Sequence, residues 1–166
     1  MTLKEFVVFR HAQKSSWIAD PDLSEEGHQQ AQLLVDLVRL KMLPTPDLLL
    51  CSPKKRSQQT FLPLHQELQI PIEIDPILDE RGNAEKGLHF ENRIKNYLDL
   101  TLPQKPHNCV FICTHLDWME IFGLMAPIDV DITSEVIHMP PAFYYHFSLV
   151  ADPQGLWKLI RKSKVG

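Results

Sequence analysis

The stretch Phe6-Val7-Val8-Phe9-Arg10-His11 joins four apolar residues directly to two side chains that can carry charge. A short, continuous apolar run is typical of a strand buried on both faces, as in a parallel sheet. A second stretch of this design, Val110-Phe111-Ile112-Cys113, ends in Thr114-His115. Helical patterns alternate with such runs along the chain, which predicts an α/β fold around a mostly parallel sheet.

The segment after the first strand has the pattern of an amphipathic helix. Ser24 is a good N-cap with two glutamates behind it, and apolar residues then follow at helical spacing as far as Met42. Pro44 and Pro46 are expected to end this helix. Residues 47–51, which are mostly apolar, are predicted to form the second strand.

A second helix is predicted to open at Ser52-Pro53, with Pro53 at its first position, and to reach about Gln69. Pro63 predicts a kink or break within it. Residues 72–74 are predicted to form an edge strand, because a proline lies close to each end. The remaining patterns predict a loop over 79–89, a helix over 91–100, a strand over 110–113, a helix over 116–124, and a closing hairpin of 143–149 with 157–160.

No repeat or linker interrupts this pattern, so residues 1–166 are predicted to form a single domain, a three-layer sandwich with helices on both faces of the sheet. The net charge of −4 and the pI near 6.0 give no basic surface for nucleic acid or an anionic membrane. The three cysteines are expected to be buried, reduced thiols. The sequence lacks a signal peptide and any apolar run of about 18 residues, which favours a cytoplasmic protein.

Three junctions between a strand and the following helix carry cationic or titratable residues. They hold Arg10-His11, Arg56 and His115. Ligands of open α/β sheets bind beyond the carboxyl ends of the strands, so these side chains are expected to converge there. Two arginines, two histidines and a helix start form a compact anion pocket that suits phosphate.

A neutral imidazole nitrogen is a competent nucleophile toward phosphorus, and a covalent intermediate divides one difficult displacement into two easier ones. The surrounding cations would stabilise the phosphoryl oxygens during transfer. Arginine then carries the charge that a metal would otherwise supply. The sequence has no P-loop, no His-Glu-x-x-His and no acidic cluster of a magnesium site, so no metal or other cofactor is expected.

Four ordered motifs resemble those of the histidine phosphatase (phosphoglycerate mutase-like) superfamily. Residues 8–12 resemble its Arg-His-Gly/Ala signature, and residues 22–31 its L-S/T-x-x-G-x-x-Q-A helix start. Residues 52–60 are very close to its S-P-x-x-R-A-x-Q-T element, and Thr114-His115 stands where the family has Gly-His or Ser-His. The short chain and the Arg-His-Ala opening look most like the SixA-type phosphohistidine phosphatases.

The resemblance implies a phosphoglycerate mutase-like fold and a role for each pocket residue. His11 would be the nucleophile, Arg10 and Arg56 would clamp phosphate, and His115 would bind phosphate and stabilise charge. Lys14 stands where many relatives have Ser or Thr, so it is either a cationic phosphate contact or a solvated side chain. Two further residues depart from the family pattern. Ser57 replaces Ala and is expected to pack, whereas Thr114 replaces Gly and is expected to crowd the backbone near His115 slightly.

Leu78-Asp79-Glu80-Arg81 resembles the family segment whose glutamate is the general acid. SixA-type members are generally held to lack this acid. Glu80 is therefore either the acid that protonates an alkoxide leaving group or a surface-loop carboxylate, and Asp79 and Glu85 compete for the role.

The function predicted from these residues is a phosphatase with a histidine nucleophile, acting on protein phosphohistidine or on a small phosphate ester. Three alternatives remain: a phosphoglycerate mutase-like phosphotransferase, a non-catalytic phosphate-binding module and a metal-dependent hydrolase. The partner would be the phosphorylated substrate, with no nucleic acid and no membrane. The oligomeric state and the region after Leu124 stay unassigned.

Overall fold

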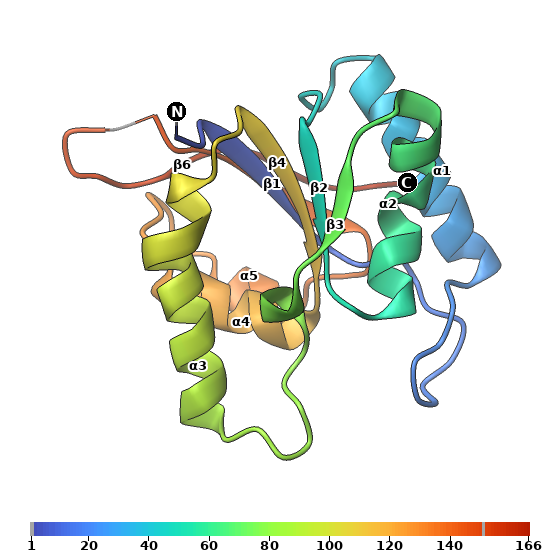
Figure 1. The fold of residues 1–166 in the computed structure, drawn as a ribbon, viewed down its shortest axis with the longest axis horizontal. Helices are drawn as coiled ribbons and strands as arrows, with labels where there is room; N and C mark the ends of the chain where they lie inside the picture. Colours follow the sequence, from blue (N-terminus) through green and yellow to red (C-terminus); the bar gives the residue numbers. More distant parts are fainter. Residues whose placement is uncertain (1, 151) are drawn as a thin grey trace.

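A computed structural model describes residues 2–150 and 152–166, and the six strands in this part form one sheet in the order β3-β2-β4-β1-β5-β6 (Figure 1). The four strands from β3 to β1 are parallel, and β5 and β6 continue the sheet antiparallel. The mostly parallel sheet expected from the sequence is confirmed. The strands are β1 (Glu5–Arg10), β2 (Leu48–Cys51), β3 (Ile72–Ile74), β4 (Cys109–Thr114), β5 (Phe143–Ser148) and β6 (Lys158–Lys164).

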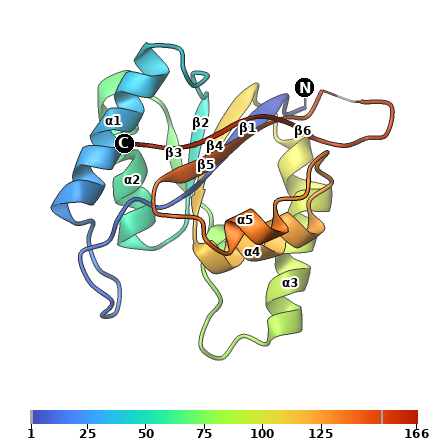
Figure 2. The ribbon, with the colours of Figure 1, turned by 180° about the vertical axis from the view of Figure 1, so that it is seen from behind.

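Helices cover both faces of the sheet, which confirms the predicted three-layer architecture (Figures 1 and 2). Two helices lie on one face, and the other three lie on the opposite face. The first pair is α1 (Glu25–Arg39) and α2 (Lys55–Leu68), and the second group is α3 (Gly87–Asn96), α4 (Leu116–Met125) and α5 (Thr133–Val136). None of these helices is long and apolar enough to cross a membrane.

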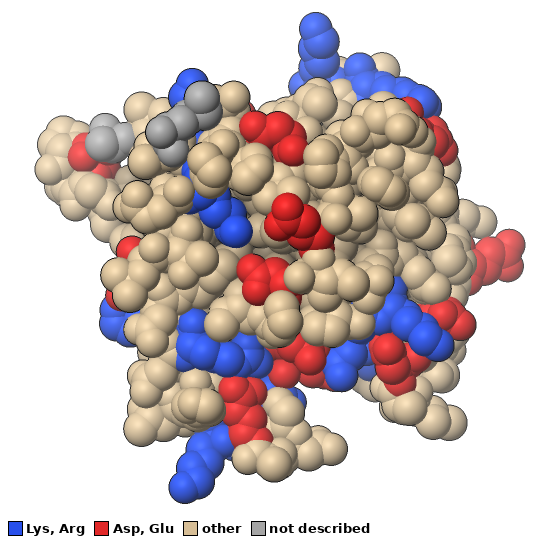
Figure 3. Space-filling model, viewed as in Figure 1, with Lys and Arg blue, Asp and Glu red and all other residues tan. Residues whose placement is uncertain are grey.

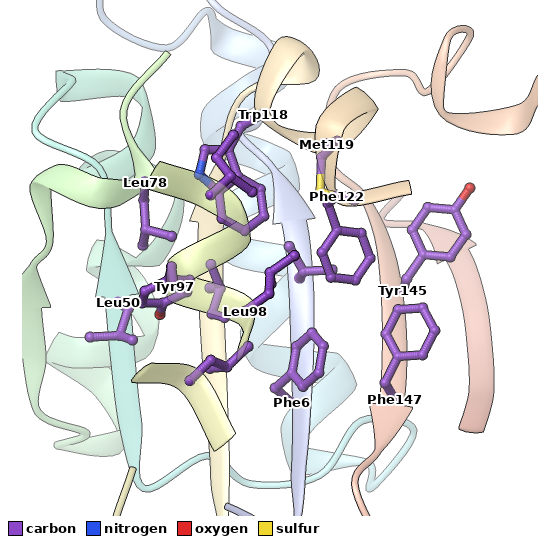
Figure 4. Packing of buried hydrophobic residues seen from close by; sticks show 14 of the residues in the cluster. Phe6, Leu50, Leu78, Tyr97, Leu98, Trp118, Met119, Phe122, Tyr145 and Phe147 are labelled. Carbon is purple, nitrogen blue, oxygen red and sulfur yellow. The ribbon is translucent and has the colours of Figure 1, made fainter. Parts of the chain in front are cut away.

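The residues of β1 alternate between two cores, which explains why its apolar run is continuous. Val7 and Phe9 belong to the core under α1 and α2, whereas Phe6 and Val8 belong to the core under α3 and α4. In this second core Phe6 contacts aromatic rings of α4 and β5 (Figure 4). Both faces of this strand are therefore buried, and only the residues at its carboxyl end can contact a ligand.

The first two helices begin and end differently from the prediction in three details. Ser24 does cap α1, with its hydroxyl accepting from the N–H of Gly27, but α1 ends at Arg39 instead of near Met42. The reason is a left-handed residue, Lys41 at φ 57°, which turns the chain before the prolines are reached. In α2 the first helical residue is Lys55, so Pro53 precedes the helix, and α2 continues through Pro63 without a break.

The loop after β3 is shorter than predicted, because α3 begins at Gly87 rather than at residue 91. The first buried residue of this helix is Phe90, and the polar, glycine-containing sequence before it shows no helical pattern of apolar residues. The helix then continues into a π-helical turn, Tyr97–Thr101, and a 3₁₀ turn. The edge position of β3, the closing hairpin of β5 and β6 and the three buried, unpaired cysteines are confirmed.

Candidate active site

The carboxyl ends of β1, β2 and β4 bring the predicted side chains together. Arg10 is the last residue of β1, and His11 extends its pairing by donating its N–H to the carbonyl of Thr114 at 3.0 Å. His115 follows β4 directly, and Arg56 lies in the first turn of α2, after β2. Residues that are distant in the sequence therefore meet at one edge of the sheet, as the parallel topology requires.

His11 is almost fully buried, and its two ring nitrogens have different partners. Its Nδ1 lies 2.7 Å from the carbonyl oxygen of Ala12, which can only accept, so Nδ1 carries the proton. Burial, together with the neighbouring cations, lowers the pKa of His11 to about 3. At neutral pH, Nε2 is therefore unprotonated, the form that a nucleophile needs.

Arg56 is the centre of the site, and its side chain is 3% exposed. Its Nε donates to Nε2 of His11 at 3.2 Å, and one terminal nitrogen donates both to Glu80 Oε2 at 2.8 Å and to His115 Nδ1 at 3.3 Å. One guanidinium thus orients both histidines and the carboxylate.

Two arginine nitrogens in the site are buried without a hydrogen-bond partner in the described part of the chain. They are Nε of Arg10 and Nη1 of Arg56, the latter 3.6 Å from a carboxylate oxygen of Asp20. Buried donors of this kind cost free energy unless something accepts from them. Phosphoryl oxygens would satisfy both, since guanidinium groups bind them with charge-assisted hydrogen bonds.

His115 is held in one orientation by its two neighbours. Its Nδ1 accepts from Arg56, so the proton lies on Nε2, which donates to Ser52 Oγ at 2.7 Å. Burial, and then the nearby His11 and Arg56, lower the pKa of His115 to about 2. The two imidazole rings lie 5.4 Å apart, so two neutral histidines face each other across the site.

A cavity of about 260 Å³ opens onto these groups. Its lining includes all six residues predicted from the sequence: Arg10, His11, Lys14, Arg56, Glu80 and His115. Burial and the neighbouring Arg56 lower the pKa of Lys14. The mouth lies at the end of the molecule where Figure 1 places the loops after β1 and β3, and there acidic and basic side chains lie close together around a notch (Figure 3).

The three acidic candidates for the proton donor occupy different places. Glu80 lines the cavity, whereas Glu85 faces away and binds Arg93 at 2.7 Å. Asp79 has an oxygen 3.8 Å from His115 Nε2, and burial raises its pKa, but it does not line the cavity. The geometry therefore favours Glu80 over its competitors.

Arg93, on α3, fastens the chain that carries Glu80. Its guanidinium donates to the carbonyl oxygens of Ile77, Asp79 and Glu80 and to the carboxylate of Glu85. The Glu80 loop, residues 79–86, is held at a second point by Asp117, which accepts from the N–H of Arg81 at 2.9 Å.

Motif residues without a chemical role hold the strand ends together. Thr60 accepts from the N–H of Ala12 at 2.9 Å and donates to the carbonyl of Arg56 at 2.7 Å, which ties the chain after His11 to Arg56. Gly27 allows a close backbone approach, because a Cβ there would lie 2.1 Å from the carbonyl oxygen of Gln13.

The two unusual motif residues also form hydrogen bonds. Ser57 is buried and donates to the carbonyl of Cys113. The hydroxyl of Thr114 donates to Leu78 at 2.7 Å, so Thr114 ties β4 to the segment just before the Glu80 loop.

Sequence reasoning missed several residues of the site. Ser52 belongs to the motif over residues 52–60, but the motif does not indicate its hydrogen bond with His115. Asp117 and Glu120 line the cavity from α4, two and five residues after His115, and helical spacing from the strand end could have indicated them. Trp17 lines it from the loop after β1, where no sequence pattern marks it.

A sequence model of the histidine phosphatase superfamily (branch 1) matches residues 6–99, more than half of the chain. The chain belongs to this superfamily. The matched region carries four of the residues that line the cavity, Arg10, His11, Arg56 and Glu80. A search of curated proteins finds none with significant sequence similarity.

Solved structures of the same fold include several phosphatases. A candidate phosphohistidine phosphatase SixA from Nakamurella multipartitia is 16% identical, with a TM-score of 0.72 over 98% of this chain and 96% of its own. The α-ribazole phosphatase of Shigella flexneri is 18% identical, with a TM-score of 0.73 over 98% of each chain. A mycobacterial glucosyl-3-phosphoglycerate phosphatase is 15% identical, with a TM-score of 0.69 over 98% of this chain and 100% of its own. At these identities the likeness shows the phosphoglycerate mutase-like fold of this superfamily member.

Proposed function

We propose that this chain is a phosphatase that transfers a phosphoryl group from a phosphate monoester to Nε2 of His11 and then to water. The observation that carries the proposal is the unprotonated Nε2 of His11 beside two arginines, each with a buried nitrogen that has no hydrogen-bond partner among the described residues. A nucleophile and the donors for the phosphoryl oxygens are thereby present at one point. These cations stabilise the transferring group without a metal ion.

In the first step the Nε2 lone pair forms the N–P bond while the P–O bond to the leaving group breaks. Protonated Glu80 gives its proton to the leaving oxygen, which departs as an alcohol. In the second step Glu80, now a carboxylate, takes a proton from the attacking water, and the N–P electron pair returns to Nε2. Arg10 and Arg56 hold the phosphoryl oxygens in both steps, and His115 orients Arg56 by accepting a hydrogen bond from it.

A second candidate substrate is phosphohistidine on a protein, and the openness of the site favours it. The Glu80 side chain, which lines the cavity, is 38% exposed. A P–N bond also breaks with less help to the leaving group than a P–O bond. For this substrate Glu80 would be dispensable, so the two candidates differ in their dependence on one residue.

The test is rapid alkaline quench of the metal-free protein with ³²P-labelled aryl phosphate and with a phosphohistidine peptide, because phosphohistidine survives alkali. Wild type should carry label on His11, and His11→Ala should lose both label and turnover while remaining folded. His28→Ala, on the exposed face of α1, is the matched control and should behave as wild type.

Glu80→Gln separates the two substrates. A loss of about 10²- to 10⁴-fold on the ester, with the peptide unaffected, identifies Glu80 as the general acid of an ester phosphatase. Equal turnover by wild type and Glu80→Gln on both substrates would assign phosphohistidine as the substrate class. Phosphate binding without label or turnover would replace catalysis by a binding function, and loss of activity in chelator would contradict the metal-free mechanism.

A further inference from the structure

A second cavity, of about 400 Å³, lies beside the first and shares four of its lining residues. The shared residues are Arg10, His11, Lys14 and Trp17, so the two cavities meet at the nucleophile. A phosphoryl group bound at this junction borders both cavities. Its leaving oxygen can then lie beside Glu80 in the first cavity, while the rest of the leaving group extends into the second.

The walls of the two cavities differ in charge. The first includes, besides Glu80, the carboxylates of Asp117 and Glu120, which repel an anionic leaving group. In the described part of the chain the second is lined by no carboxylate, and its charged residues are Arg10 and Lys14. The loop also contributes the hydroxyls of Ser15 and Ser16. A leaving group that carries a second negative charge would thus be drawn toward the second cavity.

Trp17 gives this cavity a flat apolar wall. Its side chain is 86% exposed, whereas Trp118 and Trp157 are buried at 0% and 6%. The ammonium of Lys14 lies 4.1 Å from the centroid of the Trp17 ring, so cation and aromatic face are presented together. An indole this exposed offers a large apolar surface for stacking beyond the part that Lys14 contacts.

The loop that carries Trp17 has a fixed base although its tip projects beyond the sheet (Figure 1). The N–H of Ser15 donates to the carbonyl of Asp22 at 2.9 Å, and Lys14 forms a β-bridge with Leu23. Lys14 is thereby held in place at the edge of the site. The neighbouring Ile18 is 80% exposed and lines neither cavity.

We infer that the second cavity is the leaving-group subsite and takes phosphate monoesters whose leaving group is planar, aromatic and negatively charged. The ring would stack on Trp17, and its anionic substituent would pair with Lys14. This inference rests on the proposed function and narrows its substrate class. It also assigns Lys14 to the leaving group rather than to the phosphoryl oxygens.

Stacking is tested with 1-naphthyl phosphate and glycerol 1-phosphate as substrates. Trp17→Ala should lower kcat/KM for the naphthyl ester about tenfold, the scale of one aromatic stacking contact, and change the glycerol ester less than twofold. Ile18→Ala, in the same loop, should change neither. An equal loss on both esters, or none on either, would overturn the stacking role.

The charge contact is tested with 4-carboxyphenyl phosphate against phenyl phosphate. Lys14→Met keeps the apolar stem and should lower kcat/KM about fivefold to tenfold for the carboxylated ester alone. An equal loss on both esters would place Lys14 on the phosphoryl group and overturn its assignment to the leaving group.

A binding measurement separates failure of this inference from failure of the proposed function. The non-hydrolysable 4-nitrobenzylphosphonate should quench the fluorescence of exposed Trp17 in wild type and in Ile18→Ala, but not in Trp17→Ala. Quenching in a protein that turns over no ester would contradict the phosphatase and leave the subsite intact. Normal His11 labelling with no quenching would contradict the subsite and leave the phosphatase intact.

Discussion

The site has an inner and an outer part, and they are held in different ways. The inner part consists of Arg10, His11, Arg56 and His115, and three of these side chains are 2–3% exposed. Strand pairing and buried hydrogen bonds fix it from below. The outer part is the Glu80 loop, residues 79–86, which is half exposed and held mainly by the single side chain of Arg93.

This difference separates two tasks of a phosphatase. The inner part must keep two histidines neutral and several cations dry, which only a rigid, water-excluding environment achieves. In the proposed mechanism the outer part has to deliver one proton, and this requires a position but not burial. Substitutions in the inner part should therefore affect every substrate, whereas those in the outer part should affect only substrates that need the proton.

The largest effect is expected from Arg56→Ala. This change removes the donor to His11, Glu80 and His115 together, and should cost roughly 2–4 kcal/mol of transition-state stabilisation, or about 30- to 1,000-fold in kcat/KM. The loss should be similar on an aryl phosphate and on a phosphohistidine peptide. Lys55→Ala, the exposed neighbour in α2, is the control and should keep full activity; a loss below about tenfold for Arg56→Ala would remove it from the site.

The inner part could be predicted from the sequence because its residues follow apolar strands that a simple pattern reveals. Once β1 and β4 are parallel neighbours, Arg10, His11 and His115 must lie at one edge. Register then places Arg10 opposite Thr114, so the residues that follow both strands converge without further information. The motif around Arg56 added the third junction.

The outer part could not be predicted in the same way, because no periodic pattern runs through it. The contacts of this loop depend on where α3 begins, and no sequence pattern indicates its start at Gly87. They also depend on Arg93, whose side chain extends from α3 to the backbone of the loop. Glu80 and Glu85 are the same residue type and differ in which arginine each binds, Arg56 for Glu80 and Arg93 for Glu85. Trp17 could not be predicted for the same reason, because an exposed loop residue belongs to no periodic pattern of apolar residues.

A smaller effect, on stability, is expected from pH. The pKa values of His11 and His115 are lowered to about 3 and about 2, so below about pH 6.5 the unfolded chain binds protons that the folded chain does not. The free energy of unfolding should be highest above pH 6.5 and fall by about 2 kcal/mol per histidine at pH 5.

Urea unfolding at pH 7 and pH 5 measures this loss. His115→Asn should lose about 2 kcal/mol less than wild type between the two pH values, whereas His28→Asn, on the exposed face of α1, should lose as much as wild type. An unchanged loss in His115→Asn would mean that His115 is not held neutral in the folded protein.

The smallest effect, and the sharpest test of the outer part, is expected from Arg93→Ala. Freed from its three carbonyl contacts, the Glu80 loop should hold the carboxylate less often over the leaving group, which lowers kcat on an aryl phosphate about tenfold, equivalent to about 1.4 kcal/mol. The phosphohistidine peptide should be unaffected, and Lys95→Ala, exposed on the same helix, should behave as wild type. In a Glu80→Gln background Arg93→Ala should add nothing, because a residue that acts only through Glu80 has no effect once the acid is gone. A further tenfold loss in that double variant would show that Arg93 supports the inner part as well, and the division between the two parts would then not hold.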